Sequence, residues 1–228
     1  MAVVTLLDLN AGRPNSGVAA IVAAIAQAGH RAAVVDVRRG DPIPGNIEAL
    51  VSTGGPGSPH ESGAWQAPFR RALRSAILGE LPLLAICYSF QVLSSELGAR
   101  VERLRTKRMG VFPLRPTSDG LLDPWLGPAA SSEVFEMRGY GVWGGDMRVL
   151  ARGKEGDTTA ARFGDAALGC VFHPEAEPVS VAAWLDVPDN RAMLARIEGT
   201  PGPEAMKQAA PRLREANEVL LAQFLRGL

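Results

Sequence analysis

Short apolar segments alternate with helical segments through the first hundred residues of this chain, and this alternation is what most limits its possible folds. The sequence predicts strands over 2–7, 31–37, 49–52 and 82–86, and helices ending near Gly29, between Gly63 and Gly79, and from about Tyr88 to Leu97. Asn15 and Ser16 are candidate N-caps of the first helix. Strands that alternate with helices form βαβ units, so we expect an α/β fold with a doubly wound, mainly parallel sheet.

The pattern changes after this region. From 101 to 172 glycine and proline recur, and short extended runs at 110–114, 134–135, 148–151, 160–163 and 167–172 predict an antiparallel extension or edge of the sheet. After Pro178 the sequence is mostly helical, over 181–185, 191–197 and one long segment from 204 to 225. We therefore expect a single domain over 1–228, with 178–228 as a helical C-terminal appendage.

Composition excludes several classes of protein. Lys plus Arg and Asp plus Glu both number 24, so the formal net charge is zero, and neither nucleic acid nor an anionic membrane is an expected partner. Two cysteines and three histidines are too few for a disulfide framework or a structural zinc site, so we expect no cofactor and no metal. The N-terminus has no signal-peptide pattern, and no run approaches about 18 apolar residues, so a cytoplasmic location is expected.

The segment Leu83-Leu-Ala-Ile-Cys-Tyr-Ser-Phe-Gln91 runs from a predicted strand directly into a predicted helix, with Cys87 at the junction. Ala85 and Ser89 are small, as a sharp turn that exposes a nucleophile requires. The helix N-terminus favours a thiolate, and the backbone N–H of Tyr88 would point at an oxyanion formed when Cys87 attacks a carbonyl. The alternative is a buried structural cysteine.

A loop rich in glycine and proline, Ser52-Thr-Gly-Gly-Pro-Gly-Ser-Pro59, follows the third predicted strand. Such a loop can bring backbone N–H groups close to a ligand, and open parallel sheets bind ligands at this carboxyl edge. The loop lacks the Lys-Ser/Thr ending of a phosphate-binding loop, so we do not expect it to hold a nucleotide. An ordinary turn is the alternative.

A further predicted strand ends in Gly169-Cys-Val-Phe-His-Pro-Glu175. In an extended chain His173 and Glu175 share a face, so the carboxylate can hold the tautomer and orientation of the imidazole. His173 could then accept the thiol proton and later deliver it to a leaving amine. Taken alone, a histidine at a strand end is more often an ordinary hydrogen-bonded side chain.

Together these three segments resemble the class I (triad) glutamine amidotransferases, whose motifs read Gly-Gly-Pro-Gly-x-Pro, Gly-x-Cys-x-Gly-x-Gln and Phe-His-Pro-Glu. The resemblance covers roughly residues 2 to 176 and is strongest to stand-alone members related to the GMP synthase glutaminase domain. It implies a flavodoxin-like fold, a γ-glutamyl thioester, release of ammonia and hydrolysis to glutamate. The roles it implies are Cys87 as nucleophile, His173 as base, Glu175 as orienting carboxylate, Gly55 and Tyr88 as oxyanion N–H donors, and Gly57 and Gln91 as substrate contacts.

Three features depart from that family pattern. Ala85 and Ser89 stand where glycine is usual, for which we expect strain of about 1–3 kcal/mol at most. Arg138 stands where the family commonly has a histidine that helps to hold the α-amino and α-carboxylate ends of the substrate. Arg138 could pair with a substrate carboxylate, mark a different γ-glutamyl substrate, or point to solvent. The third departure is the region 178–228, which the motifs do not cover.

Other residues have less specific interpretations. The apolar side chains of 178–228, namely Trp184, Leu185, Met193, Leu194 and Ile197, either pack the appendage onto the domain or form a docking face for an acceptor subunit. His60 could lie at the rim of the pocket, His30 is expected at the surface, and Cys170 is expected in the core.

Three functions remain open from the sequence. The first is a glutaminase that acts on L-glutamine and hands ammonia to a separate synthetase subunit. The second is a hydrolase of another γ-glutamyl amine or peptide, which the same triad would serve and which Arg138 favours. The third is a catalytically silent homologue, against which the intact set of Cys87, His173 and Glu175 argues.

Overall fold

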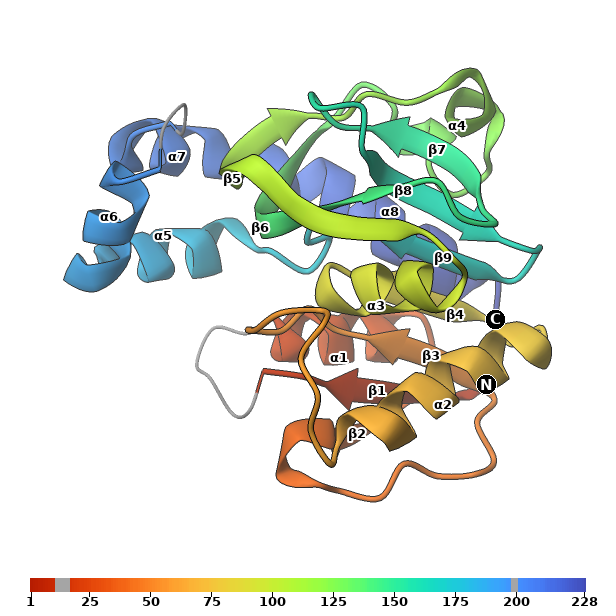
Figure 1. The fold of residues 1–228 in the computed structure, drawn as a ribbon. Helices are drawn as coiled ribbons and strands as arrows, with labels where there is room; N and C mark the ends of the chain where they lie inside the picture. Colours follow the sequence, from red (N-terminus) through yellow and green to blue (C-terminus); the bar gives the residue numbers. More distant parts are fainter. Residues whose placement is uncertain (11–16, 198–200) are drawn as a thin grey trace.

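The computed structural model describes residues 1–10, 17–197 and 201–228, and Figure 1 shows how its elements are arranged. Its strands are β1 (Val3–Asp8), β2 (Arg31–Asp36), β3 (Ala49–Ser52), β4 (Leu83–Ile86), β5 (Arg100–Pro113), β6 (Glu133–Trp143), β7 (Arg148–Arg152), β8 (Thr158–Phe163) and β9 (Ala167–Cys170). The α-helices are α1 (Val18–Gln27), α2 (Gln66–Leu78), α3 (Tyr88–Glu96), α4 (Ser118–Leu122), α5 (Pro178–Asp186), α6 (Pro188–Ala195), α7 (Pro203–Ala209) and α8 (Leu213–Arg226). Short 3₁₀ turns are η1 (Val37–Arg39), η2 (Gly127–Ala129) and η3 (Ala210–Arg212).

The main sheet has the strand order β2-β1-β3-β4-β9-β8-β7. The strands from β2 to β9 in this order run parallel, whereas β8 and β7 are antiparallel to their neighbours. Helices lie on both faces of the parallel part (Figure 1). The chain therefore has the flavodoxin-like, doubly wound fold that the sequence predicts, and its β3, β4 and β9 strands place their carboxyl ends side by side.

Alternation along the strands builds the two layers of core. In β4, Leu84 and Ile86 pack with residues of α1 and α8, whereas Leu83 and Ala85 pack with residues of α2 and α3. Successive side chains of a strand point to opposite faces, so a strand buried on both sides has a continuous apolar sequence. This explains why the parallel strands were predictable to within about a residue or two.

The middle of the chain differs from the prediction in two ways. β5 and β6 form a separate two-stranded sheet rather than an extension of the main sheet, and both are longer than expected. In addition, β9 is parallel to β4, so only β7 and β8 provide the predicted antiparallel edge. Much of β5 is exposed and charged, and this removes the apolar pattern from which its length could have been predicted.

The C-terminal region is helical, as the sequence predicts. Pro211 interrupts the predicted long helix, since proline has no N–H and clashes with the preceding turn, and α7, η3 and α8 result. α8 packs in the main core through residues such as Leu220 and Phe224, whereas α5, α6 and α7 pack against β5 and β6. Leu185 and Leu194 are buried there, and Met193 is 38% exposed.

Two further predictions concern the described residues only in part. The candidate caps Asn15 and Ser16 lie outside the described residues, and the structure places Gly17 directly before α1. Across the described ranges no helix is both long enough and apolar enough to cross a membrane.

Candidate active site

The backbone turns sharply at Cys87, between β4 and α3. Cys87 has φ 50° and ψ −103°, a left-handed conformation that a residue with a Cβ adopts only when its surroundings force it. The N–H of Cys87 donates to the carbonyl of Cys170 (2.7 Å), and its own carbonyl accepts from the N–H of Gln91 (3.0 Å) as the helix begins. The predicted strained turn is therefore present, and the N–H of Tyr88 lies in the first helical turn, where no intrahelical acceptor exists.

The two non-glycine neighbours of this turn fit without strain of their own, because Ala85 lies inside β4 and Ser89 inside α3. The hydroxyl of Ser89 donates to the carbonyl of Thr53 (2.6 Å) and shares a hydrogen bond with the hydroxyl of Ser52 (2.7 Å). Ser89 thus connects the helix that follows Cys87 to the start of the glycine loop.

His173 and Glu175 are joined as the sequence predicts. Nδ1 of His173 lies 2.8 Å from Oε1 of Glu175, whose side chain is buried, and the N–H of His173 donates to the carbonyl of Phe135 (2.8 Å). Nε2 of His173 is buried and has no hydrogen-bond partner among the described residues. With Nδ1 held by the carboxylate, Nε2 is left as the ring nitrogen that can exchange a proton in the cavity.

The charge state of His173 follows from three influences. Burial alone lowers the pKa of His173, but the charges of the Glu175 carboxylate and the Cys87 sulfur, together with the hydrogen bond to Glu175, outweigh it and raise the pKa well above its usual range. The second cysteine behaves differently: burial first, and then Glu175 and Cys87, raise the pKa of the fully buried Cys170 thiol. Cys170 is thus in the core, as expected, and is held as a neutral thiol.

Two glycines leave room for this arrangement. A Cβ on Gly54 would lie 2.8 Å from Cε1 of His173 and 3.2 Å from Cβ of Cys87, so these two side chains meet over the bare backbone of the loop. A Cβ on Gly17 would overlap Cγ of Glu175. Only glycine fits at either position without a shift of the neighbouring side chain.

A partly buried network of polar side chains contacts the glycine loop. The Arg38 guanidinium donates to the carbonyl of Pro56 and to Oε1 of Glu61 (3.1 Å). The hydroxyl of Tyr88 also donates to Oε1 of Glu61 (3.1 Å) and accepts from the side-chain amide of Gln66 (2.7 Å). Burial and the neighbouring Glu61 raise the pKa of Tyr88, which keeps this hydroxyl a donor.

Sequence reasoning missed Arg38, Glu61 and Gln66. A usable signal was present, since Arg38 follows the carboxyl end of β2 and Glu61 follows the glycine loop, at the same edge of the sheet as Cys87. Arg38 also stacks on Trp65, with its Cζ 4.5 Å from the ring centroid.

All of the predicted site residues line one cavity of about 640 Å³, which we call the site cavity. They are Gly55, Gly57, Cys87, Tyr88, Gln91, Arg138, His173 and Glu175. The amide of Gln91 donates to the carbonyl of Tyr140 (3.3 Å), a second wall residue. The described part of the chain holds no cluster of His, Cys, Asp and Glu side chains that could bind a metal ion.

Arg138 does not point to solvent, so that alternative is wrong: its side chain is 0% exposed. Its guanidinium lies 2.7 Å from Oε2 of Glu136 and 2.7 Å from Oδ2 of Asp157, and it donates to the carbonyl of Tyr140 (3.0 Å). Burial lowers the pKa of Arg138, but Glu136 and Asp157 outweigh it and raise the pKa. Two carboxylates already balance its charge, although its Nη2 has no hydrogen-bond partner in the described structure.

The other histidines lie apart from Cys87. His60 is exposed, with Nε2 2.7 Å from the carbonyl of Val101 and its ring against that of Tyr140. His30 is partly buried rather than at the surface, because its two ring nitrogens bond the N–H of Ala2 and the carbonyl of Leu225.

Comparison with known proteins agrees with this geometry. The family model for glutamine amidotransferase class-I matches residues 14–181, so the chain belongs to the class-I glutamine amidotransferase family. It is 31% identical over 181 residues to a GMP synthase [glutamine-hydrolyzing] of Thermus thermophilus, covering 75% of this chain and 32% of that protein. It is 32% identical over 131 residues to the GMP synthase [glutamine-hydrolyzing] of Thermobifida fusca, covering 56% of this chain and 24% of that protein. The chain thus spans about a quarter to a third of the length of these relatives.

Solved structures support the same fold. A glutamine amidotransferase from Methylobacillus flagellatus superposes with a TM-score of 0.85 at 18% identity, over 100% of this chain and 96% of that one. A glutamine amidotransferase from Thermotoga maritima superposes with a TM-score of 0.83 at 17% identity, over 98% and 96% of the two chains. At these identities the likeness concerns the fold alone.

Proposed function

We propose that this protein hydrolyses L-glutamine through a thioester on Cys87 and supplies the ammonia to a separate acceptor enzyme. The observation that carries the proposal is the joint placement of Cys87 and His173 over Gly54, with Nδ1 of His173 held by Glu175 at 2.8 Å. This arrangement leaves Nε2 of His173 as the group that exchanges a proton with the Cys87 sulfur.

In the first half of the reaction the thiolate of Cys87 attacks the γ-carbonyl carbon of glutamine. The N–H groups of Gly55 and Tyr88 stabilise the oxyanion, which is worth most when the donors are fixed beforehand. His173 then delivers its proton to the amide nitrogen, the C–N bond breaks, and ammonia leaves the γ-glutamyl thioester. Gly57, Gln91 and Arg138 are the proposed contacts of the rest of the substrate.

In the second half a water molecule adds to the thioester. Nε2 of His173 accepts a proton from this water and the C–S bond breaks. Glutamate is released, and the Cys87 thiolate is regenerated. Glu175 touches no reacting atom in this scheme, and its role is to keep the proton of His173 on Nδ1 and to stabilise the imidazolium.

The proposal of a separate acceptor rests on the relatives. Two GMP synthases described as glutamine-hydrolysing match this chain over 32% and 24% of their own lengths. Because the names of these relatives join a synthase activity to glutamine hydrolysis, we propose a synthetase as the acceptor of the ammonia.

The test is to incubate the purified protein with L-glutamine and to measure glutamate and ammonia, together with alkylation by a glutamine-like electrophile. We expect Cys87→Ala to abolish turnover and labelling. Cys170→Ala is the matched control, because it removes a thiol that is fully buried, and we expect it to keep both. Labelling of Cys87 without turnover would indicate a partner-dependent glutaminase. If neither turnover nor labelling occurs, the catalytically silent homologue is the better interpretation.

A further inference from the structure

The strand β5 contains a large bulge beside the site cavity. Arg103 pairs with Tyr140 and Arg108 pairs with Arg138, so residues 104–107 of β5 stand opposite Gly139 alone. Leu104 is buried and anchors this bulge, whereas residues 105–107 are exposed. Bulges re-aim side chains and occur preferentially next to active sites, so we asked what this one presents.

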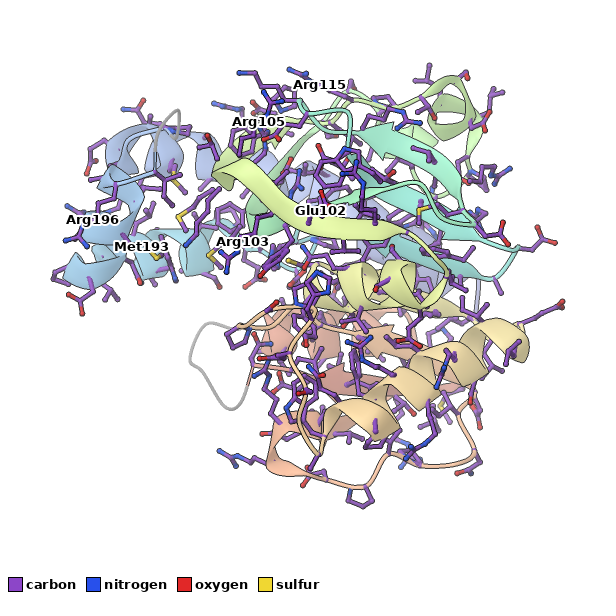
Figure 2. All side chains as sticks on the ribbon, viewed as in Figure 1. Glu102, Arg103, Arg105, Arg115, Met193 and Arg196 are labelled. Carbon is purple, nitrogen blue, oxygen red and sulfur yellow. The ribbon has the colours of Figure 1, made fainter. Side chains whose placement is uncertain are left out.

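The bulge faces helix α6 across a second hollow of about 630 Å³, which we call the outer hollow. Its bulge side consists of Arg105, Thr106 and Lys107, and its α6 side includes Asp189, Met193 and Arg196. Figure 2 shows Arg105 on β5, Met193 on α6 and Arg196 directly after α6. Lys107, Met193 and Ile197 line the outer hollow and the site cavity alike, so the two spaces adjoin.

The outer hollow is positively charged although the whole chain carries no net charge. Within the described residues, Arg105, Lys107 and Arg196 form no salt bridge. Of the residues that the structure describes, Asp189 is the one acid on its wall, and nearby Glu155 accepts from the backbone N–H of Arg105 (3.4 Å) rather than from its guanidinium. Three like charges gathered around one concavity create a potential that favours a bound anion.

The position of the hollow relative to His173 indicates what kind of anion fits. In the proposed reaction His173 protonates the leaving nitrogen, so the leaving group departs beside His173. Beyond His173 the site cavity is lined by α5 through Val181 and Trp184, and then by α6 through Met193. The wall that the site cavity shares with the outer hollow thus includes the apolar side chains of Met193 and Ile197.

We infer that the outer hollow is a subsite for a carboxylate or phosphate group of a small molecule on the leaving-group side of the site cavity. This inference rests on the proposed Cys87 chemistry. The anion comes from one of two sources: the far end of an amine joined to the γ-glutamyl group, or a separate small anion bound beside glutamine. In the first case Cys87 attacks the γ-carbonyl, His173 protonates the amine, and water hydrolyses the thioester, with no other reactant.

The experiment compares three substrates: L-glutamine, γ-glutamyl-hexylamine and γ-glutamyl-6-aminohexanoate, of which only the last carries a carboxylate at the end of the chain. For the tethered source we expect kcat/KM to favour the anionic amide over the neutral one by about tenfold or more. The triple variant Arg105→Gln/Lys107→Gln/Arg196→Gln should lose this preference and hydrolyse glutamine as before. The control Arg71→Gln/Arg115→Gln/Arg226→Gln removes the same charge from exposed positions outside both cavities and should keep the preference.

A second measurement tests the separate anion. Inorganic phosphate, titrated at constant ionic strength, should change glutamine turnover saturably in the wild type and in the control variant but not in the triple variant. Binding of γ-glutamyl-6-aminohexanoate and of phosphate to Cys87→Ala, measured by calorimetry, provides a readout that needs no turnover.

Two outcomes would overturn the subsite alone. One is glutamine turnover without anion preference, phosphate effect or anion binding, and the other is an anion effect that survives the triple substitution. Loss of all turnover and Cys87 labelling, with anion binding retained, would instead remove the proposed function.

Discussion

One wall of the site cavity and one wall of the adjoining outer hollow differ in how their polar groups are satisfied. The wall formed by the glycine loop, which we call the loop wall, is fixed by Arg38, Glu61 and Ser89, whose polar atoms bond to the loop or to Tyr88. The wall formed by the β5 bulge and α6, which we call the basic wall, presents exposed cations without salt-bridge partners among the described residues. A pre-organised wall suits transition-state stabilisation, whereas an exposed charged wall suits recognition of a variable group.

The difference predicts that substitutions on the loop wall and around His173 reduce the rate of glutamine hydrolysis, whereas substitutions on the basic wall leave it unchanged. Arg138, which pairs with Arg108 at the end of the β5 bulge, is by contrast buried in ion pairs with Glu136 and Asp157. Substitution there should affect folding first.

The largest effect on rate is expected for Glu175→Gln. An amide can hold the imidazole in the wrong tautomer and cannot stabilise the imidazolium, so kcat should fall on the order of 10³- to 10⁴-fold. Single-turnover kinetics with L-glutamine would measure this. Glu177→Gln is the control, since Glu177 lies on the same segment but is exposed. Equal rates for Glu175→Gln and the wild type would contradict the role of Glu175.

The same variant carries a pH prediction. The pKa of His173 is raised in the folded protein, so the protonated imidazole stabilises the fold fully below its ordinary value of 6.5, and this stability is lost as the pH rises through the raised value. Removing the Glu175 carboxylate lowers that pKa. Urea unfolding should therefore show a smaller loss of stability toward alkaline pH in Glu175→Gln than in the wild type. Parallel pH profiles for the two proteins would refute this.

The next largest effect is on stability and concerns Arg138. Arg138→Met leaves Asp157 and part of the charge of Glu136 buried without compensation, so we expect a loss of about 3–5 kcal/mol in the free energy of unfolding. The exposed Arg74 provides the control, because its partner Glu96 keeps a second ion pair with Arg70, and Arg74→Met should cost about 1 kcal/mol or less. Urea denaturation measures both. Similar losses in the two variants would mean that the buried ion pairs carry no special weight.

How far the sequence predicts this molecule depends on the region. The strands β3 and β4 and the turn at Cys87 were predictable because each is a local pattern: an apolar run, a small-residue turn and a helix start. The ion pairs of Arg138 were not, because Asp157 is contributed by a distant turn and the pattern around Arg138 gives no sign of burial. The length of β5 was hidden for a related reason, since an exposed charged strand lacks the alternation on which such predictions depend.

For Gly54→Ala we expect kcat to fall about 10²-fold. The added methyl group of Gly54→Ala would lie 2.8 Å from Cε1 of His173, so the imidazole must move by several tenths of an ångström, and displacements of about 1 Å can reduce rates about 10²-fold. Gly45→Ala is the matched control, because nothing lies within 4 Å of its added Cβ. Both variants should remain folded, as circular dichroism would show. An unchanged kcat for Gly54→Ala would mean that the loop does not fix the distance between Cys87 and His173.

The smallest predicted effect tests whether the loop wall acts through the orientation of a single peptide group. Arg38 bonds the carbonyl of Pro56, and in a trans peptide this directs the N–H of Gly57 to the opposite side. Arg38→Gln should raise KM for glutamine about tenfold and change kcat less, since the N–H of Gly57 is a proposed substrate contact and a charged hydrogen bond contributes about 1.5–3 kcal/mol. Millimolar guanidinium should restore part of the activity of Arg38→Ala, because it can occupy the vacated space between Glu61 and Trp65.

Arg39→Gln is the control, since the neighbouring Arg39 is 71% exposed. A loss of stability without any change in KM, or a failure of guanidinium to restore activity to Arg38→Ala, would show that Arg38 supports the fold rather than the orientation of the loop.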